Sequence, residues 1–282
     1  MLRKQRREES KGRPRKDLGP DAWTFCLAVA LSAAGTFPLA AEDGLTARKL
    51  TEEVIASASA DDESVAIDME LTDSRNQVRQ RTATLYSKKD GDGNVMRLIR
   101  FHTPADLARS GILVLDKGEE DAEQWLYLPA YHTSRKVAAA NRSDTWMGTD
   151  FAYEDMSDPN VDRYEYRYLA DERVDGTDCK VVEAVPRDEK LKKESGYSKT
   201  VSWIDPVRKI AMKVDFYDKE GALSKELRYS RLETRGKYYR WGAWEMHDVK
   251  RAHRTALRFK DRKIDQGIED RFFTVRYLER GR

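Results

Sequence analysis

The chain has 282 residues, of which 39% are hydrophobic and 36% charged, and its 52 Lys and Arg nearly balance its 50 Asp and Glu. This length fits one large β domain or two modest domains, and we find no repeat with the ~20–50-residue period of a solenoid or propeller. The mixed charges favour a well-solvated surface and give no reason to expect a nucleic-acid partner.

Residues 1–41 have the layout of an export signal. A basic region precedes the uncharged run 22–41, which ends Phe-Pro-Leu-Ala-Ala before Glu42 and Asp43. This order predicts a secretory signal cleaved after Ala41 and a mature domain over 42–282, with a retained membrane anchor as the alternative. Residues 1–41 hold 8 Lys and Arg and 4 Asp and Glu, which leaves 44 basic and 46 acidic side chains and a net charge of −2 in the remainder.

Cysteine use limits how the fold can be stabilised. Cys26 lies inside the export segment, so Cys179 would be alone in the mature chain. No internal disulfide can then form. We expect the domain to be held together by burial, and Cys179 to be a small core residue and not a nucleophile.

The mature chain opens with a helical pattern and continues with strands. Residues 44–58 predict a short amphipathic helix that either packs on a sheet or acts as a lid. From Ser64 onward the hydrophobic period becomes two, with Val65, Ile67, Met69 and Leu71 on one face. Strands at 76–87 and 94–103 follow, separated by an Asx- and Gly-rich turn at 90–94.

Later segments repeat the strand pattern. Strands are expected at 162–170, 178–186, 199–205, 209–217, 223–234, 238–250 and 254–264, with a charged helical or mobile excursion at 187–197. The total is about ten or eleven strands joined by hairpin turns, without the helices that a parallel sheet requires. Such a wide antiparallel sheet must curl or be covered, and either outcome produces a concave apolar surface.

The most distinctive stretch is 125–156. It opens Trp-Leu-Tyr-Leu-Pro-Ala, continues with Arg135 and Lys136 before Val-Ala, and closes with Trp-Met-Gly-Thr-Asp-Phe-Ala-Tyr-Glu-Asp. These motifs resemble the bacterial family of outer membrane lipoprotein-sorting proteins, which are relatives of the periplasmic lipoprotein carrier and its outer-membrane acceptor. The resemblance implies a mainly β fold: a single curved antiparallel sheet forming an incomplete, half-open β-barrel with a few covering helices. It also implies a periplasmic location and an apolar interior that holds acyl chains.

Aromatic residues are the evidence for a ligand within the sequence itself. Any single one is explained by ordinary sheet packing, in which aromatic cross-strand pairs contribute ~0.2–1 kcal/mol. Taken together they predict an apolar cavity, since each buried CH₂ of an acyl chain contributes ~0.8 kcal/mol. The residues expected to bind lipid or to form the cavity mouth are Trp125, Tyr127, Trp146, Met147, Phe151, Tyr153, Trp203 and Trp244.

Carboxylates in the same stretch have two interpretations. Asp150, Glu154 and Asp155 could act as acid–base catalysts if burial raises a pKa. The preferred interpretation is that they and Arg135 pin a loop across the barrel mouth by charge-assisted hydrogen bonds. Other signs of catalysis are weak: the four histidines lack zinc-motif spacing, and no Gly-x-Ser-x-Gly or phosphate-loop motif occurs. No metal and no cofactor are expected.

These patterns predict a non-enzymatic carrier. It would shield the acyl chains of a lipid or lipoprotein during transfer from the inner to the outer membrane, working as a monomer with transient membrane contact. A second hypothesis is an accessory lipid-binding protein of an inner-membrane lipid-exporting pump, which would make that transporter a partner. A third is an envelope-acting hydrolase that uses Asp150, Glu154 and Asp155.

Overall fold

The computed structural model describes residues 39–281 except residue 119. The expected export segment therefore lies outside the described residues, apart from 39–41. None of the helices in the described part is long and apolar enough to span a membrane.

One antiparallel sheet contains every described strand. Its order is β6-β5-β4-β3-β2-β1-β13-β12-β11-β10-β9-β8-β7, so hairpin neighbours in sequence are neighbours in space on both sides of the β1–β13 pair. The strands are β1 Asp62–Thr72, β2 Val78–Lys89, β3 Val95–Thr103, β4 Gly111–Lys117, β5 Glu120–Leu128, β6 Thr133–Lys136, β7 Tyr164–Val174, β8 Thr177–Pro186, β9 Lys199–Asp205, β10 Ile210–Tyr217, β11 Leu223–Arg235, β12 Tyr238–Asp248 and β13 His253–Ile264.

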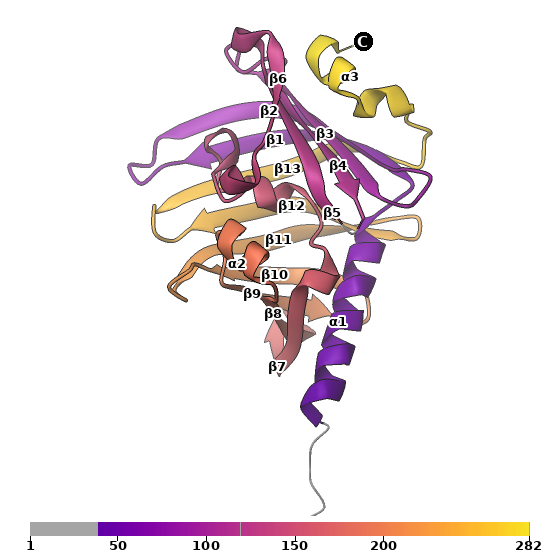
Figure 1. The fold of residues 1–282 in the computed structure, drawn as a ribbon, viewed down its shortest axis with the longest axis vertical. Coiled ribbons are helices and arrows are strands. Elements are labelled where there is room, and N and C mark those ends of the chain that lie inside the picture. Colours follow the sequence, from indigo (N-terminus) through magenta and orange to yellow (C-terminus); the bar gives the residue numbers. More distant parts are fainter. Residues whose placement is uncertain (1–38, 119, 282) are drawn as a thin grey trace, which may run out of the picture. The chain divides into compact units, whose positions relative to one another are not determined.

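The sheet is curved but open. The edge strands β6 and β7 pair only with β5 and β8 among the described strands, so the sheet does not close into a barrel. Figure 1 shows that the sheet is curved, with α1 (Leu39–Ala58) and the short α2 (Glu189–Glu194) on its concave side. The expected half-open barrel is confirmed, with thirteen strands in place of about ten or eleven.

The strands form because their side chains alternate between two environments. In β1, Val65, Ile67, Met69 and Leu71 are buried while the residues between them are partly exposed. The turn after β2 is closed by the Asp90 carboxylate, which accepts from the main-chain N–H groups of Asp92 and Asn94, both at 2.9 Å. Such Asx turns fix the hairpin register.

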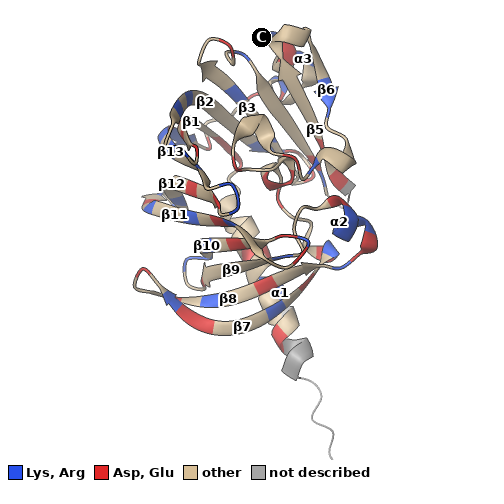
Figure 2. Ribbon diagram, turned by 90° about the vertical axis from the view of Figure 1, so that its left-hand side faces the viewer, with Lys and Arg blue, Asp and Glu red and all other residues tan. Residues whose placement is uncertain are grey.

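Each face of the sheet has its own core. The concave face carries a cluster from β1–β4 and β11–β13 that includes Ile67, Phe101, Ile112 and Met246. On the opposite face of β3–β5, Leu98 and Leu113 pack against the C-terminal 3-10 helix Asp270–Phe273 and α3 (Val275–Arg280). The surface strands carry interspersed Lys, Arg, Asp and Glu (Figure 2).

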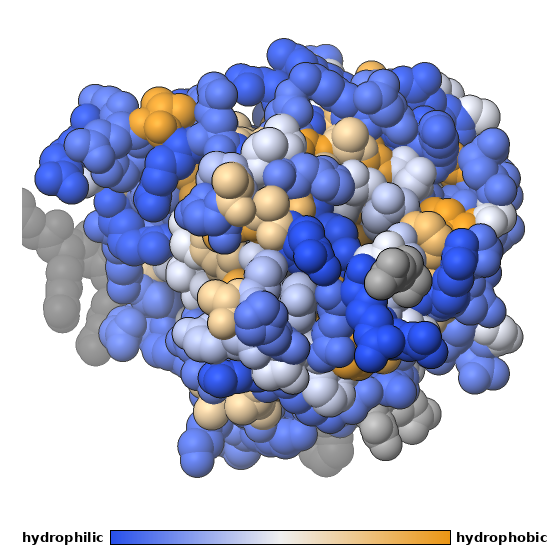
Figure 3. All heavy atoms as spheres, turned by 90° about the horizontal axis from the view of Figure 1, so that it is seen from above, coloured by the Kyte–Doolittle hydropathy of each residue, from blue (hydrophilic) through white to orange (hydrophobic). Residues whose placement is uncertain are grey.

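Residues 137–163 cross the concave face between β6 and β7, and we call them the crossing segment. They contain four 3-10 turns and the isolated bridge between Thr145 and Ala152. Gly148 has φ +72°, which lets the chain reverse so that the Trp146 N–H donates to the Phe151 carbonyl at 2.8 Å. Seen from above, hydrophobic residues form small separate groups on a largely hydrophilic surface (Figure 3).

Candidate functional site

A cavity of about 770 Å³ lies on the concave face. Its walls are α1, the inner face of β7–β12, the crossing segment, and α2 with the chain that leads to β9. Residues of β4, β5 and the turn between β2 and β3 complete the lining. The volume is within the ~300–1,000 Å³ typical of small-molecule sites. The hollow of the curved sheet is thus only partly filled by the protein's own side chains.

The apolar wall of the cavity comes from alternate residues of three neighbouring strands. They are Val214 and Phe216 of β10, Leu227 and Tyr229 of β11, and Trp244 and Met246 of β12. Alternate positions of a strand share one face, so these six side chains form a continuous surface. Ile55 and Ala56 of α1 also line the cavity.

The crossing segment fills the remaining part of the hollow. Trp146 stacks on Phe101 of β3 with ring centroids 5.3 Å apart, and Phe151 joins the same buried cluster. Phe151 also lines the cavity, so it forms part of the boundary between core and cavity. This arrangement makes the position of the crossing segment decisive for the cavity's shape.

Asp150 attaches the crossing segment to β13. Its carboxylate is fully buried and accepts hydrogen bonds from His253 Nδ1 (2.7 Å), Thr255 Oγ1 (2.7 Å) and Arg251 Nη2 (2.8 Å). The Asp150 main-chain N–H donates to Thr255 Oγ1 at 3.0 Å. These charge-assisted bonds link two parts of the chain that are about a hundred residues apart.

Asp155 is buried next to the cavity and is held by Tyr197, in the chain before β9, and by Lys225 of β11. The Tyr197 hydroxyl donates a hydrogen bond to the Asp155 carboxylate at 3.1 Å, and Lys225 Nζ donates one to the Tyr197 hydroxyl oxygen at 2.8 Å. Lys225 Nζ itself lies 3.8 Å from Asp155 Oδ2. Burial raises the pKa of the Asp155 carboxyl, and the charge of Lys225 opposes this rise.

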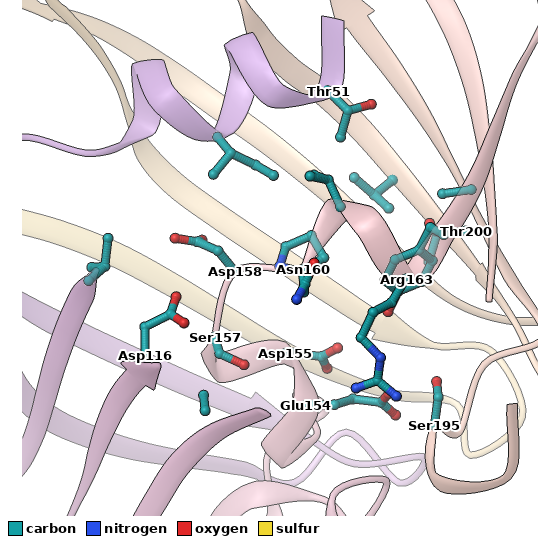
Figure 4. A pocket seen from close by; sticks show the side chains of 18 of the residues that line it. Thr51, Asp116, Glu154, Asp155, Ser157, Asp158, Asn160, Arg163, Ser195 and Thr200 are labelled. Carbon is teal, nitrogen blue, oxygen red and sulfur yellow. The ribbon is translucent and has the colours of Figure 1, made fainter. Parts of the chain in front are cut away.

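Glu154 lines the cavity beside Asp155 in a different environment. Its Oε1 accepts from the Gly196 N–H at 2.8 Å, and a Cβ on Gly196 would come within 3.1 Å of that oxygen, so glycine permits the close approach. Burial, together with the neighbouring charge of Asp155, raises the pKa of Glu154 to about 7. Figure 4 shows Glu154 and Asp155 near Arg163 and Ser195, with Thr51 of α1 on the other side of the cavity.

A network of ion pairs joins the elements around the cavity. Asp121 of β5 pairs with Arg142 (3.0 Å), with Lys190 of α2 (2.9 Å) and with Arg163. Arg163 also pairs with Asp188 at 2.9 Å, and the pKa of the Asp188 carboxyl is lowered to about 2 chiefly by that bond. The network holds α2 and both ends of the crossing segment against β5.

The described residues hold no group of three or more His, Cys, Asp or Glu suited to a metal ion. Cys179 is a buried free thiol whose pKa is raised by burial. Its location in the cluster with Val181 and Trp203 makes it a packing residue of the sheet.

The sequence-predicted aromatic residues are distributed over both faces. Phe151 and Trp244 line the cavity, while Met147 and Tyr153 pack against the concave core near it. Trp125 and Tyr127 lie on the opposite face, against α3, because their positions in β5 alternate with the inward-facing Gln124.

The other predicted residues are also spread out. Trp203 packs on the face of β9 opposite to the cavity-lining Thr200 and Ser202. Trp146 is buried on Phe101 and is not part of the lining. Arg135 lies in β6 with its guanidinium 4.7 Å from the Tyr131 ring centroid, away from Asp150, Glu154 and Asp155.

Several residues of the site gave no signal in the sequence. Tyr197 and Lys225 hold Asp155 but lie 42 and 70 positions away from it along the chain. Val214 and Phe216 could have been found, since their alternation in a strand is visible in the sequence. Alternation does not reveal which face of the sheet is concave.

Comparisons of the sequence with known families and curated proteins give one match. A family model described as "Uncharacterized protein" matches residues 93–280. No curated protein sequence is significantly similar to the chain.

Three solved structures are similar to most of the chain. A putative outer membrane lipoprotein-sorting protein domain from Vibrio parahaemolyticus is 29% identical, with a TM-score of 0.78, and the match covers 84% of this chain and 100% of that one. A DUF1329 family protein from Desulfovibrio piger is 27% identical, with a TM-score of 0.78, over 84% of this chain and 99% of that one. A LolA superfamily protein from Nitrosomonas europaea has the same fold, with 19% identity and a TM-score of 0.64 over 82% of this chain and 98% of that one.

Proposed function

Since this chain belongs to the family whose model matches residues 93–280 and is similar to a putative outer membrane lipoprotein-sorting protein domain over 84% of its length, we propose that it is a non-enzymatic lipid or lipoprotein carrier of the periplasm. In this proposal the cavity shields an acyl chain while the cargo passes from the inner to the outer membrane. The observation that carries the proposal is the unfilled cavity of about 770 Å³ on the concave face.

The apolar wall accounts for the binding energy. An acyl chain with ~14 buried CH₂ groups would gain roughly 11 kcal/mol from leaving water. The loss of translational and rotational freedom offsets ~4–15 kcal/mol of such a gain. The expected net affinity is therefore moderate, which suits a carrier that must also release its cargo.

Loading and release require one wall of the cavity to move. Helix α1 is attached to the sheet by Ala47 and Leu50, which pack on Tyr166, Val182 and Ile204. Ser57 also donates a hydrogen bond to the Lys209 carbonyl at 2.6 Å. The crossing segment is held by the fully buried Asp150. We therefore assign the lid role to α1 and the fixed wall to the crossing segment.

The test uses the protein without residues 1–41. Lipids extracted from the purified protein are identified by mass spectrometry, and the affinity for a fluorescent acyl probe is measured. Ala184→Trp places an indole in the cavity from β8 and should remove probe binding. The control is Val207→Trp, at a turn position that is 85% exposed, which should bind like the wild type. Equal binding by both variants would rule out the cavity as the site.

A further inference from the structure

The polar end of the cavity has two buried hydrogen-bond acceptors that lack a donor in the described chain. Gln124 is only 3% exposed; its Nε2 donates to the Tyr153 carbonyl at 2.8 Å, but its Oε1 has no partner among the described residues. Glu194 Oε2 is also buried without a partner in the described chain. Both residues line the cavity.

Both acceptors lie close in the chain, or by a hydrogen bond, to the segments that hold Glu154. Gln124 bonds to the carbonyl of Tyr153, the residue before Glu154, and Glu194 lies two residues before Gly196, which donates to Glu154 Oε1. A buried acceptor without a donor destabilises the folded protein. A ligand that donates hydrogen bonds here would remove that cost, whereas a second acceptor would not.

The nearby cations are already engaged. Lys225 donates to Tyr197 and faces Asp155, while Arg142 pairs with Asp121. Lys89, at the rim, donates to the Ser59 carbonyl at 3.1 Å. No cation of the described chain lies within ion-pair distance of Glu154 or Glu194. The charged and titratable groups around Glu154 are Asp155, Tyr164, Tyr197 and Lys225. Arg163 also lies near Glu154 (Figure 4), but it pairs with Asp121 and Asp188.

We propose that the cavity selects an amphiphile that carries a primary ammonium group. The ammonium would pair with Glu154 and donate a further hydrogen bond to Gln124 Oε1, while the acyl chain would lie along Val214, Leu227 and Trp244. Trp244 Nε1 is a buried donor without a partner in the described chain and lies on this apolar wall, where the carbonyl of an ester or amide could accept its hydrogen bond. This inference rests on the proposed carrier function and specifies the cargo's polar group.

The test compares three probes of equal chain length: dodecylamine, dodecanol and dodecanoate, each below its critical micelle concentration. Calorimetry should show that the wild type binds the amine at least tenfold more tightly than the alcohol, and the acid most weakly. Glu154→Gln should reduce the preference for the amine over the alcohol about tenfold. The matched control is Glu226→Gln, on the same strand as Lys225 but outside the cavity lining, which should keep the full preference.

The pH profile gives a second readout. Pairing with an ammonium favours the ionised form of Glu154, so the amine affinity of the wild type should rise as the pH increases through about 7. This rise should be absent in Glu154→Gln. Equal binding of amine and alcohol, or an unchanged preference in Glu154→Gln, would overturn the inference alone. Failure of all three probes to bind would instead overturn the carrier function.

Discussion

Replacing Asp150 by Ala tests whether the crossing segment is a fixed wall. The change removes the acceptor of two buried donors: the Nδ1 of His253 and the hydroxyl of Thr255, whose Oγ1 still accepts from the main-chain N–H of residue 150. Each loss costs ~1–3 kcal/mol. Arg251 is partly exposed and regains water, so its lost ion pair adds ~0–1 kcal/mol. Together these terms predict a loss of roughly 2–7 kcal/mol in the free energy of unfolding, a range that includes the ~3–5 kcal/mol typical of a broken buried ion pair.

The assay is urea unfolding followed by circular dichroism, with hydrogen exchange of residues 144–156 in parallel. The exchange should accelerate in Asp150→Ala because the Trp146–Phe151 main-chain bond is no longer held against β13. The control is Asp171→Ala, an exposed carboxylate that pairs with Lys180 and should cost under ~1 kcal/mol. A loss below ~1 kcal/mol in Asp150→Ala, or unchanged exchange, would refute this account of the anchor.

Three further predictions concern the polar end of the cavity, the C-terminal helix and the thiol. The pKa of Glu154 is about 7 in the folded protein and about 4.5 in the unfolded chain, so its contribution to stability is present below pH 4.5 and is lost as the pH rises through 7. The free energy of unfolding, measured at successive pH values, should fall by roughly 3 kcal/mol over this range in the wild type and not in Glu154→Gln. Leu278→Ala removes a fully buried side chain from the cluster under α3 and should cost ~2–5 kcal/mol in urea unfolding, whereas the exposed Val249→Ala should cost under ~0.5 kcal/mol; equal costs would contradict the packing of α3. The buried Cys179 should react with a thiol reagent only after unfolding, and fast labelling of the folded protein would show that the sheet is open there.

The sequence predicted the strands well because most of them alternate strictly. In β1, the residues Val65, Ile67, Met69 and Leu71 that were assigned to one face are all buried. The turn at 90–94 also has the expected chemistry, since the Asp90 side chain closes it. Local patterns of this kind depend only on neighbouring residues, and the sequence displays them directly.

The C-terminal residues do not form the structure that their local sequence pattern favours. Phe272, Phe273, Val275 and Tyr277 are β-prone, yet they form a 3-10 helix and α3. The Thr274 hydroxyl accepts from the Tyr277 N–H at 3.1 Å, and Gly281 ends the helix in the left-handed region. The two caps and the packing on β3–β5 outweigh the intrinsic β preference.

The candidate site was predictable only in part, for a physical reason. Alternation separates Trp125 from Gln124, but it does not say which side of the sheet is hollow. Here the side with Gln124 is hollow, and Trp125 packs under α3. The partners of Asp155 come from distant strands, so the tertiary fold alone brings them together.

The central claim, that the cavity binds an acyl chain, is tested most directly by how affinity depends on chain length. Octanol, decanol and dodecanol are titrated into the wild type and into Ala184→Trp. In the wild type each added CH₂ should tighten binding by up to about fourfold, which corresponds to ~0.8 kcal/mol. In Ala184→Trp this dependence should disappear because the indole occupies the cavity. A wild type whose affinity does not change with chain length would contradict the claim.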